Sequence, residues 1–366
     1  MGRKNIQRNM RIALDTPRTT CGWKVGLTKS FRNASSKLWS EYGTNLQNQP
    51  DDLRRIYLAD SSKLLVQADQ AGAEALIVAY EAPKGNYRSL FEYNVKVHSW
   101  LAMQLFYHYW ITNTPYDVPH LCSLNISDLA QNPQWKDLAG VIKSSDGWEP
   151  KKRFYFIAKM VVHASSYGMR GPTFQVNVLK KSRGAIVLTR KQADEFLEKF
   201  HSLFPEIHLW HDRVRQTIIA TRTLTNLFGY PRYFAGHFDD TLWKDAYSWV
   251  PQSTVGCISN IQFCNEQDYI EVHNKDWDLL NNCHDSTLTQ APIDEVMEAA
   301  TVKKQGMEVD LVSTTGVAFK MKSEVSVGSN WAKFNDDCSN CYKAKKECQC
   351  SNYEAVNPEG MKEIKI

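Results

Sequence analysis

The sequence predicts a mixed α/β (α+β) fold whose helices are grouped in the middle of the chain. Two observations lead to this prediction. The short apolar run KLLVQAD, residues 63–69, is typical of a buried strand, and residues 72–82 continue from its end with a helical pattern. Residues 152–168 and 189–218 are also helical in pattern, whereas residues 307–331 are typical of strands.

The remaining elements are predicted from local sequence patterns and from residues that favour turns. We expect a helix end at 1–12, a loop-rich segment with short strands at 15–60, and a helix at 96–112. Proline and Asp-Gly predict that residues 113–150 are irregular. The later elements are expected to be a long helix at 152–168, a helix pair at 189–218 broken near Pro205, a hairpin at 224–234 and a long helix at 242–272.

Composition and length indicate an ordinary folded protein. The chain has 366 residues, 43% hydrophobic and 23% charged, enough for two or three packed lobes. No run approaches the ~18 apolar residues of a membrane span, and the basic N-terminus lacks the apolar core of a signal peptide. The odd number of cysteines, nine, favours reduced thiols. We therefore expect a cytoplasmic protein, in the host cytoplasm if it is viral, with no membrane partner.

Basic residues are concentrated in two segments, although the net charge is only +4. Residues 1–40 hold nine Lys and Arg against one acid, Asp15, and residues 151–190 hold nine with no acid. The two segments are consistent with a polyanion that lies between them, or with solvated surface charge. Composition alone leaves both interpretations open.

Two aspartates stand at the ends of predicted strands. Asp69 closes the strand 63–69, and Asp285 lies in NNCHDSTLTQAP, residues 281–292, at an expected hairpin tip. An Asp between strands is most often a turn residue. Two carboxylates on adjacent strands, however, can bridge hard divalent cations, and a pair of such ions stabilises the attacking and leaving oxygens in phosphoryl transfer.

A helical stripe offers a second candidate site. Lys159, His163 and Tyr167 stand at i, i+4 and i+8, and because each step drifts by only about 40° they share one face. A cation and two rings followed by Gly168 suit a triphosphate, a sugar or base, and a template base. The alternative is an amphipathic helix with a snorkelling Lys and a packed Tyr.

Three segments resemble, in order, motifs A, B and C of the DNA polymerase I type (family A) polymerases: ADQAGAEALIVAY, KMVVHASSYGM and CHDS. Flanking segments, among them KSFRNASSK, NVKVHSWLAMQLF, FPEIHLWHDRVRQT and SVGSNW, extend the likeness over about residues 10–331. Phage-type enzymes are the relatives we expect. The resemblance implies a right-hand polymerase fold with an antiparallel palm sheet and helical fingers.

The resemblance also implies roles for individual residues. Asp69 and Asp285 would hold two Mg²⁺ ions, and the backbone carbonyl of Gln70 would complete one site. The nucleotide-binding residues would be Lys159 on the triphosphate, His163 near the base or sugar, Tyr167 at the templating position, Glu74, Arg153 and Tyr155. The DNA-binding residues would be Arg32 and Gln252 in the minor groove, His284 at the primer terminus, Lys244 on the template, and Gly168.

The implied domains follow the motifs. They are a thumb-base remnant and start of the palm (1–60), the palm with motif A (61–112), the fingers with an insertion and motif B (113–230), the palm with motif C (231–331) and a Cys-rich C-terminal extension (332–366). Met1 falls about where the thumb would end. We therefore expect a separate chain that supplies the thumb, the exonuclease or both, as in a split polymerase.

Motif C and motif A point to different products. Ser286 follows His-Asp, as in single-subunit RNA polymerases of phage type, whereas DNA polymerases of this family usually have Glu there. Glu74, five residues after Asp69, resembles the steric gate that blocks a ribose 2′-hydroxyl. Because the gate touches the sugar itself, Glu74 decides in favour of DNA.

Motif B also departs from the family pattern. The Arg expected four residues before Lys159 is replaced by Tyr155, with Arg153 two residues earlier, and His163 replaces a Phe or Tyr. These changes concern nucleotide affinity and sugar discrimination.

After Trp331 the resemblance ends and a cysteine-rich segment begins. Its thiols have the spacing C-x2-C-x6-C-x-C and belong to Cys338, Cys341, Cys348 and Cys350. Four thiolates this close can form a tetrahedral zinc site, and the intervening lysines favour ionised sulfurs. The C-x-C pair is uncommon in single-zinc sites, so a reduced, mobile tail is the alternative.

The sequence thus predicts an enzyme, a DNA-directed DNA polymerase that adds dNMPs from dNTPs to a primer 3′ end on primer-template DNA, using two Mg²⁺ ions. Two other functions remain open: a single-subunit RNA polymerase, and an inactive, DNA-binding replisome subunit. Ser286 and Tyr155 motivate the last of these.

Overall fold

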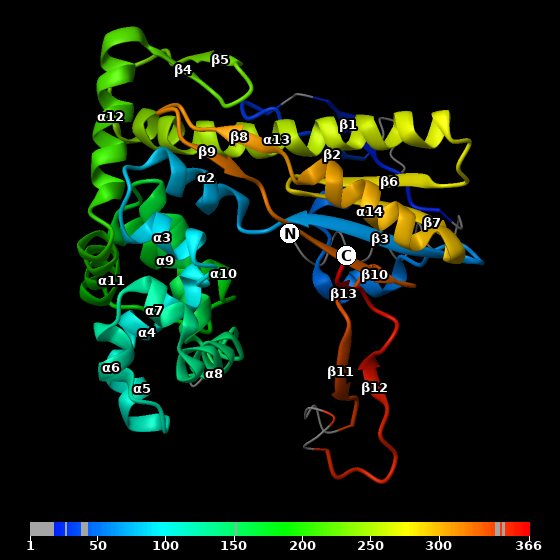
Figure 1. Cartoon of the computed structure of the whole chain (residues 1–366), viewed down its shortest axis with the longest axis horizontal. Coiled ribbons are helices and arrows are strands. Elements are labelled where there is room, and N and C mark those ends of the chain that lie inside the picture. The colour runs from blue at the N-terminus through cyan, green and yellow to red at the C-terminus, as the bar shows by residue number, and fades with distance from the viewer. Residues whose placement is uncertain (1–17, 26–27, 38–42, 151, 341–344, 346–347) are drawn as a thin grey trace. The chain divides into compact units, whose positions relative to one another are not determined.

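The structure is a computed structural model that describes residues 18–25, 28–37, 43–150, 152–340, 345 and 348–366 (Figure 1). It divides into two compact units. Unit 1 comprises Met1–Ala73, Gln252–Leu311 and Lys320–Ile366, and unit 2 comprises Glu74–Pro251 and Val312–Phe319. The helix expected at 1–12 lies outside the described residues.

Unit 1 is built on a five-stranded antiparallel sheet with the strand order β13-β10-β3-β7-β6. The strands are β3 (Lys63–Gln70), β6 (Asp278–Cys283), β7 (Ser286–Pro292), β10 (Ser323–Gly328) and β13 (Lys362–Ile364). Central β3 confirms the strand predicted at 63–69, because its apolar residues are buried between β7 and β10.

The two faces of this sheet are covered differently. Helix α14 (Val296–Met307) packs against β3 and β10, and Figure 1 shows it beside the sheet. The side chains of Leu65, Leu288, Trp331 and Met361 form a core cluster. Trp331 Nε1 donates to Gln67 Oε1 at 3.0 Å, and since side chains on a strand alternate, Asp69 shares the face of Leu65 and Gln67.

A buried polar network supports strand β7. The ammonium of Lys303, on α14, lies 2.9 Å from Glu266 Oε2 and 3.0 Å from Thr287 Oγ1, and both side chains of the ion pair are fully buried. Thr287 in turn donates to Gln262 Oε1 at 2.7 Å. Burial lowers the pKa of Lys303, and the Glu266 carboxylate opposes that shift. The network therefore fixes the strand that follows Asp285.

Smaller elements complete unit 1. They are β1 (Gly22–Lys24) paired with β2 (Ala34–Ser36), the short helices η1 (Leu46–Asn48), η2 (Asp51–Ile56) and η3 (Ile293–Glu295), and a ribbon of β11 (Asn335–Cys338) and β12 (Ala355–Asn357). Strands β8 (Asp310–Val312) and β9 (Ala318–Lys320) form a two-stranded sheet of their own. They confirm, with β10, the strands predicted at 307–331.

Unit 2 is largely helical. Its helices include α2 (Ala73–Glu81), α3 (Asn86–Glu92), α4 (Val97–Leu105), α5 (Tyr107–Asn113), α9 (Phe154–Ser166), α10 (Gly171–Lys181), α11 (Arg190–Leu203) and α12 (Glu206–Thr221), followed by the strand pair β4 (Thr223–Thr225) and β5 (Pro231–Tyr233). The helix pair broken at Pro205 and the hairpin are as predicted. Helix α13 (Asp240–Val272) is the predicted long helix, and it continues through Pro251.

The prediction that residues 113–150 are irregular is wrong. They form three helices, α6 (Val118–Ser123), α7 (Ile126–Gln131) and α8 (Pro133–Lys143). Each of these helices has a polar N-cap: the side chains of Asp117, Asn125 and Asn132 each accept a hydrogen bond from the first turn that follows. Proline sits in the first turn of α6 and α8, where it needs no N–H partner.

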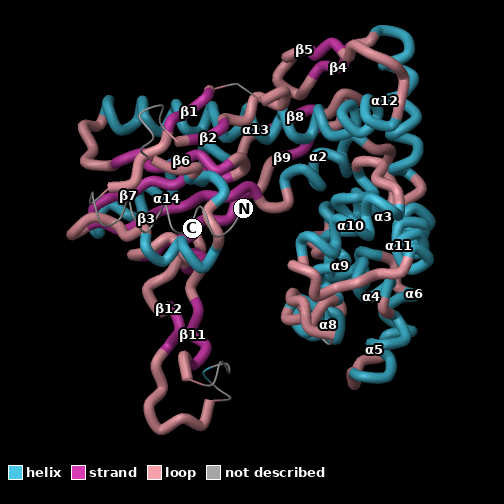
Figure 2. Tube along the Cα trace, turned by 180° about the vertical axis from the view of Figure 1, so that it is seen from behind, coloured by secondary structure: helices cyan, strands magenta, loops and turns pink. Residues whose placement is uncertain are grey.

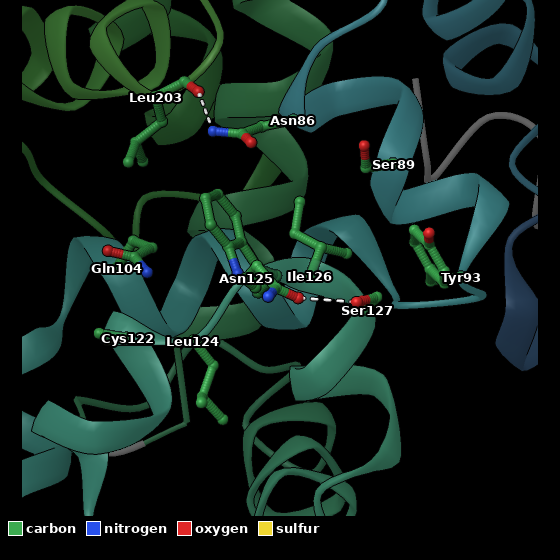
Figure 3. A pocket seen from close by; sticks show the side chains of 11 residues that line it. Asn86, Ser89, Tyr93, Gln104, Cys122, Leu124, Asn125, Ile126, Ser127 and Leu203 are labelled. Atoms are coloured by element: carbon green, nitrogen blue, oxygen red, sulfur yellow. Dashed lines mark hydrogen bonds between the residues drawn. The ribbon is translucent and has the colours of Figure 1, made fainter.

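These helices border a pocket of about 400 Å³ within unit 2 (Figure 3). Asn86, Gln104, Cys122 and Asn125 are among its lining residues, and Asn86 Nδ2 donates to the carbonyl of Leu203 at 3.4 Å. None of the site residues predicted from the sequence lines this pocket.

Candidate active site

Asp69 and Asp285 are brought together in unit 1. Asp69 is the penultimate residue of β3, and Asp285 lies in the tight turn between β6 and β7, beside Ser286, which pairs with Asp69 across the sheet. The Gln70 N–H donates to the Asp285 carbonyl oxygen at 3.0 Å. The end of the central strand is thus hydrogen-bonded to the turn that carries the second aspartate.

The turn is held in an uncommon conformation. His284 has φ 67°, a left-handed value that costs a non-glycine residue of order 1 kcal/mol. Ser259 Oγ donates a hydrogen bond to the His284 carbonyl at 2.7 Å and accepts one from Gln70 Nε2 at 2.8 Å. Ser259 is fully buried on α13. Helix α13 therefore fixes the turn and the strand end with one hydroxyl.

The acid pair is electrostatically costly when it is ionised. Burial, followed by the negative charges of Asp285 and Glu324, raises the pKa of Asp69 to about 7, and the positive charges of Lys333 and Arg54 oppose the shift. Asp69 keeps solvent-exposed surface, so a ligand can reach it. Oxygen donors whose charges repel fit a hard divalent cation, because a cation offsets that repulsion.

Two further residues flank Asp69 on the same face. Glu324, on β10, is its direct cross-strand partner, and Ser286 is its partner on β7. Glu324 is exposed, whereas Ser286 is buried and accepts a hydrogen bond from Gln67 Nε2 at 3.3 Å. The position after His-Asp is therefore packed into the sheet, and the third carboxylate beside Asp69 comes from another strand.

The loop that carries Arg32 packs against α13, the helix that carries Gln252. The backbone around Arg32 passes so close to α13 that a Cβ on Gly256 would lie 2.8 Å from the Ser30 carbonyl oxygen. Asn260 Nδ2 donates to the Phe31 carbonyl at 3.0 Å. Gln252, Gly256 and Asn260 follow at intervals of four residues, so they lie on one side of the helix.

In unit 2, the predicted stripe lies on α9 and its C-terminal cap. Lys159 and His163 are exposed, and Tyr167 is the C-cap residue, with its ring 5.1 Å from that of His163 in a T-shaped contact. The Lys159 ammonium lies 3.1 Å from Asp146 Oδ2. Both side chains of this ion pair are partly exposed, so it is weak and exchangeable.

Tyr167, in motif B, contacts Glu74, the predicted steric gate. Its hydroxyl donates a hydrogen bond to the Glu74 carboxylate. Gly168 follows with φ 64°, and a Cβ there would lie 3.1 Å from the Tyr247 ring. Both the conformation and the close approach favour glycine. The described residues thus place Glu74, Tyr167 and Gly168 in one cluster.

Tyr167 also lines a second pocket in unit 2, of about 320 Å³, together with Lys244. Two residues predicted to bind nucleotide and template therefore share one concave surface. Tyr155 is different: it is only 9% exposed, and its ring contacts His98 in a T-shaped arrangement at 5.7 Å. Arg153 is the N-cap residue of α9 and is half-buried.

Three of the four C-terminal cysteines converge. The sulfurs of Cys338, Cys348 and Cys350 all lie within 4.8 Å of one another. Cys341 lies outside the described residues. The roles assigned to all these site residues stay predictions, because the geometry places the side chains without testing what they bind.

Sequence reasoning missed Glu324 and Asp146. Glu324 is identified only by the register of β10 against β3, and Asp146 only by the ion pair with Lys159. Neither residue belongs to a motif, so no local signal marks it.

The comparison with protein families gives a match to the model described as DNA polymerase family A, over residues 142–333. Among solved structures, the chain is similar to the POL domain of Pol1 from M. smegmatis in complex with DNA primer-template and dNTP, with a TM-score of 0.64 and 13% sequence identity. The similarity covers 89% of this chain and 50% of that chain. The chain thus spans about half the length of this relative. Among the described residues, no helix has the length and apolarity needed to span a bilayer.

Proposed function

Because the chain belongs to DNA polymerase family A, we propose that it is a DNA-directed DNA polymerase that adds dNMPs to a primer 3′ end. Its fold is the right-hand polymerase fold, with an antiparallel sheet in unit 1 and a helical unit 2. We assign the palm role to the sheet of unit 1 and the fingers role to α9 and its neighbours. The observation that carries the proposal is the apposition of Asp69 and Asp285 at the β3 end and the β6–β7 turn.

The carboxylates of Asp69 and Asp285, with the carbonyl of Gln70, would hold two Mg²⁺ ions. When bound, Mg²⁺ supplies charge neutralisation and lowers the pKa of a coordinated hydroxyl. The protein's own part is to orient these oxygens: the Ser259 hydroxyl fixes both Gln70 and the turn at His284. Such fixed orientation reduces the reorganisation needed in the transition state.

The side chains of unit 2 would bind the incoming nucleotide. Lys159 would exchange its partner Asp146 for the triphosphate, whose charge is larger. In the reaction, the primer 3′-oxygen forms a bond to the α-phosphorus as the bond to pyrophosphate breaks. Glu74, oriented by the Tyr167 hydroxyl, would exclude a ribose 2′-hydroxyl by its bulk.

DNA contacts are assigned to four residues. Arg32 and Gln252 would contact the minor groove near the primer end, His284 the primer terminus, and Lys244 the template. The packing of the Arg32 loop on α13, four residues beyond Gln252, supports the first assignment. A separate chain that supplies a thumb or exonuclease, as in a split phage-type enzyme, is part of the proposal. Co-purification of a second chain from the native source tests it.

Primer extension with dNTPs or NTPs tests the activity. The wild-type chain should extend a primer with dNTPs, and Asp285→Ala should reduce the rate by at least about 10³-fold while DNA binding survives. Asp310→Ala, an exposed site in the same unit, is the matched control.

Two results would replace the proposal. A wild-type preference for NTPs would support the RNA polymerase alternative that Ser286 motivates. No extension with either substrate, despite DNA binding, would support an inactive replisome subunit, for which Ser286 and Tyr155, both buried, are the motivating features.

A further inference from the structure

The cysteine-rich segment is an excursion between two strands of the unit 1 sheet. The chain leaves β10, runs outward as β11, returns as β12 and rejoins the sheet as β13, which pairs with β10 from Val325↔Ile364 to Val327↔Lys362. Both views show the β11–β12 ribbon extending away from the sheet (Figures 1 and 2). The segment therefore begins and ends on neighbouring strands of one sheet.

The base of the ribbon is well defined by protein contacts alone. The amides of Asn330 and Asn357 exchange hydrogen bonds of 2.9 and 3.1 Å, and both side chains are buried. The Met361 N–H donates to the Ala332 carbonyl at 2.7 Å. Gly360 allows this crossing, because a Cβ there would lie 2.3 Å from Asn357 Nδ2.

Beyond this base, the described residues of the ribbon form no apolar core. Of the residues that the structure describes between Asn335 and Val356, only Cys338 is buried, with 0% of its surface exposed. The ribbon therefore has a thiol where a small domain would normally place a hydrophobic core. Small scaffolds of this kind usually need a disulfide or a metal to fold.

Hydrogen bonds draw the two sides of the ribbon together at the level of the thiols. The Ser339 N–H donates to the Glu354 carbonyl at 2.7 Å, and Asn340 Nδ2 donates to the Asn352 carbonyl at 3.0 Å. The Tyr353 hydroxyl donates to the Asp336 carbonyl at 2.5 Å. These contacts enclose the sulfurs of Cys338, Cys348 and Cys350, which lie within 4.8 Å of one another.

This arrangement suits a soft, tetrahedral cation. With Zn–S bonds of about 2.3 Å, sulfurs in a tetrahedral site lie about 3.8 Å apart, so the observed limit of 4.8 Å requires only a small contraction. The Cys350 N–H donates to Cys348 Sγ at 3.4 Å, a contact that stabilises a thiolate ligand. Thiolates favour zinc over the hard cations that carboxylates bind.

We propose that Cys338, Cys348 and Cys350 bind one Zn²⁺ ion as a structural site that folds the ribbon between β10 and β13. The site is separate from the carboxylates of the proposed active site and goes beyond the proposed function. The metal links the end of β11 to the start of the return segment, so the ribbon and the pairing of β13 depend on it.

Metal analysis of the full chain, purified without chelators, tests the proposal. We expect about one zinc per chain in the wild type and near zero in the Cys348→Ser/Cys350→Ser double variant. Cys264→Ser, an exposed cysteine of α13, should retain the wild-type content. Zinc retained by the double variant, or absent from the folded wild type, would overturn the proposal.

A second measurement on the wild-type chain does not depend on the variant folding. Alkylation followed by mass spectrometry should find the three thiols protected in the zinc-loaded chain and labelled after a strong chelator. Chelation should also make the ribbon susceptible to proteolysis near Lys345. Disulfides among these cysteines, or iron with a visible chromophore in place of zinc, would contradict the inference.

Discussion

Asp69 and Glu324 are direct cross-strand partners on β3 and β10, and their carboxylates influence one another electrostatically. The family pattern places an auxiliary carboxylate directly after the aspartate of motif C, where this chain has the buried Ser286. Glu324 supplies a carboxylate on the opposite side of Asp69. It is therefore the residue whose removal is most informative about the acid cluster.

Glu324→Gln should raise the Mg²⁺ concentration needed for primer extension by about tenfold, because a neutral amide attracts a cation less than a carboxylate does. The rate at saturating Mg²⁺ should fall far less than in Asp285→Ala. Glu363→Gln makes the same change on β13, opposite Ser326, and should leave the Mg²⁺ dependence unchanged. Identical titration curves for both variants would show that Glu324 takes no part.

Asp69→Asn should stabilise the metal-free chain at pH 8 but not at pH 4. The pKa of Asp69 is raised from 3.8 to about 7 in the folded chain, so its contribution to stability is present below pH 3.8 and is lost as the pH rises through 7. The amide removes that loss. Thermal melting in a chelator should show a difference of about 3 °C or more at pH 8. A difference that does not vary with pH, or one shared by Asp310→Asn, would refute the argument.

Glu74→Ala should raise ribonucleotide incorporation relative to deoxyribonucleotide incorporation by about 10- to 100-fold, because the side chain that crowds the 2′-position is gone. Tyr167→Phe should give a smaller increase, since it removes only the hydroxyl that orients Glu74. Single-nucleotide kcat/KM ratios measure both effects. Glu195→Ala, an exposed site on α11, should match the wild type. If Tyr167→Phe exceeded Glu74→Ala, the gate would be the tyrosine instead.

Lys303→Met should destabilise the protein by about 3–5 kcal/mol, because it leaves the carboxylate of Glu266 buried without its cation. The double variant Lys303→Met/Glu266→Leu should recover most of this loss. Urea unfolding followed by circular dichroism measures the free energies of unfolding. Equal stability of the single and double variants would mean that the two charges are not coupled.

Sequence reasoning predicted the elements whose signals are local. The apolar run at 63–69, the break at Pro205 and the long helix that became α13 are read directly from neighbouring residues. The helices at 118–143 were missed because they are short and contain prolines in the first turns of α6 and α8, where proline begins a helix and does not break it.

The candidate site shows the same division. The motifs predicted Asp69 and Asp285, and the structure brings both to the end of strand β3 and the adjoining β6–β7 turn. Glu324 depends on strand register between segments far apart in sequence. The return of the chain as β13 also has no sequence signal, because a three-residue edge strand carries too little pattern.

The order of strands in the unit 1 sheet has a consequence for how the chain reaches its native state. Central β3 ends at Gln70, and its neighbour β7 begins at Ser286, 216 residues later (286 − 70). Most of unit 2 is a continuous stretch of local helical contacts that needs no partner from β7 or β10. Local contacts form faster than contacts that close long loops. We therefore expect unit 2 to fold before β3 acquires its partner β7, so that β3 stays unpaired until the later part of the chain has been made.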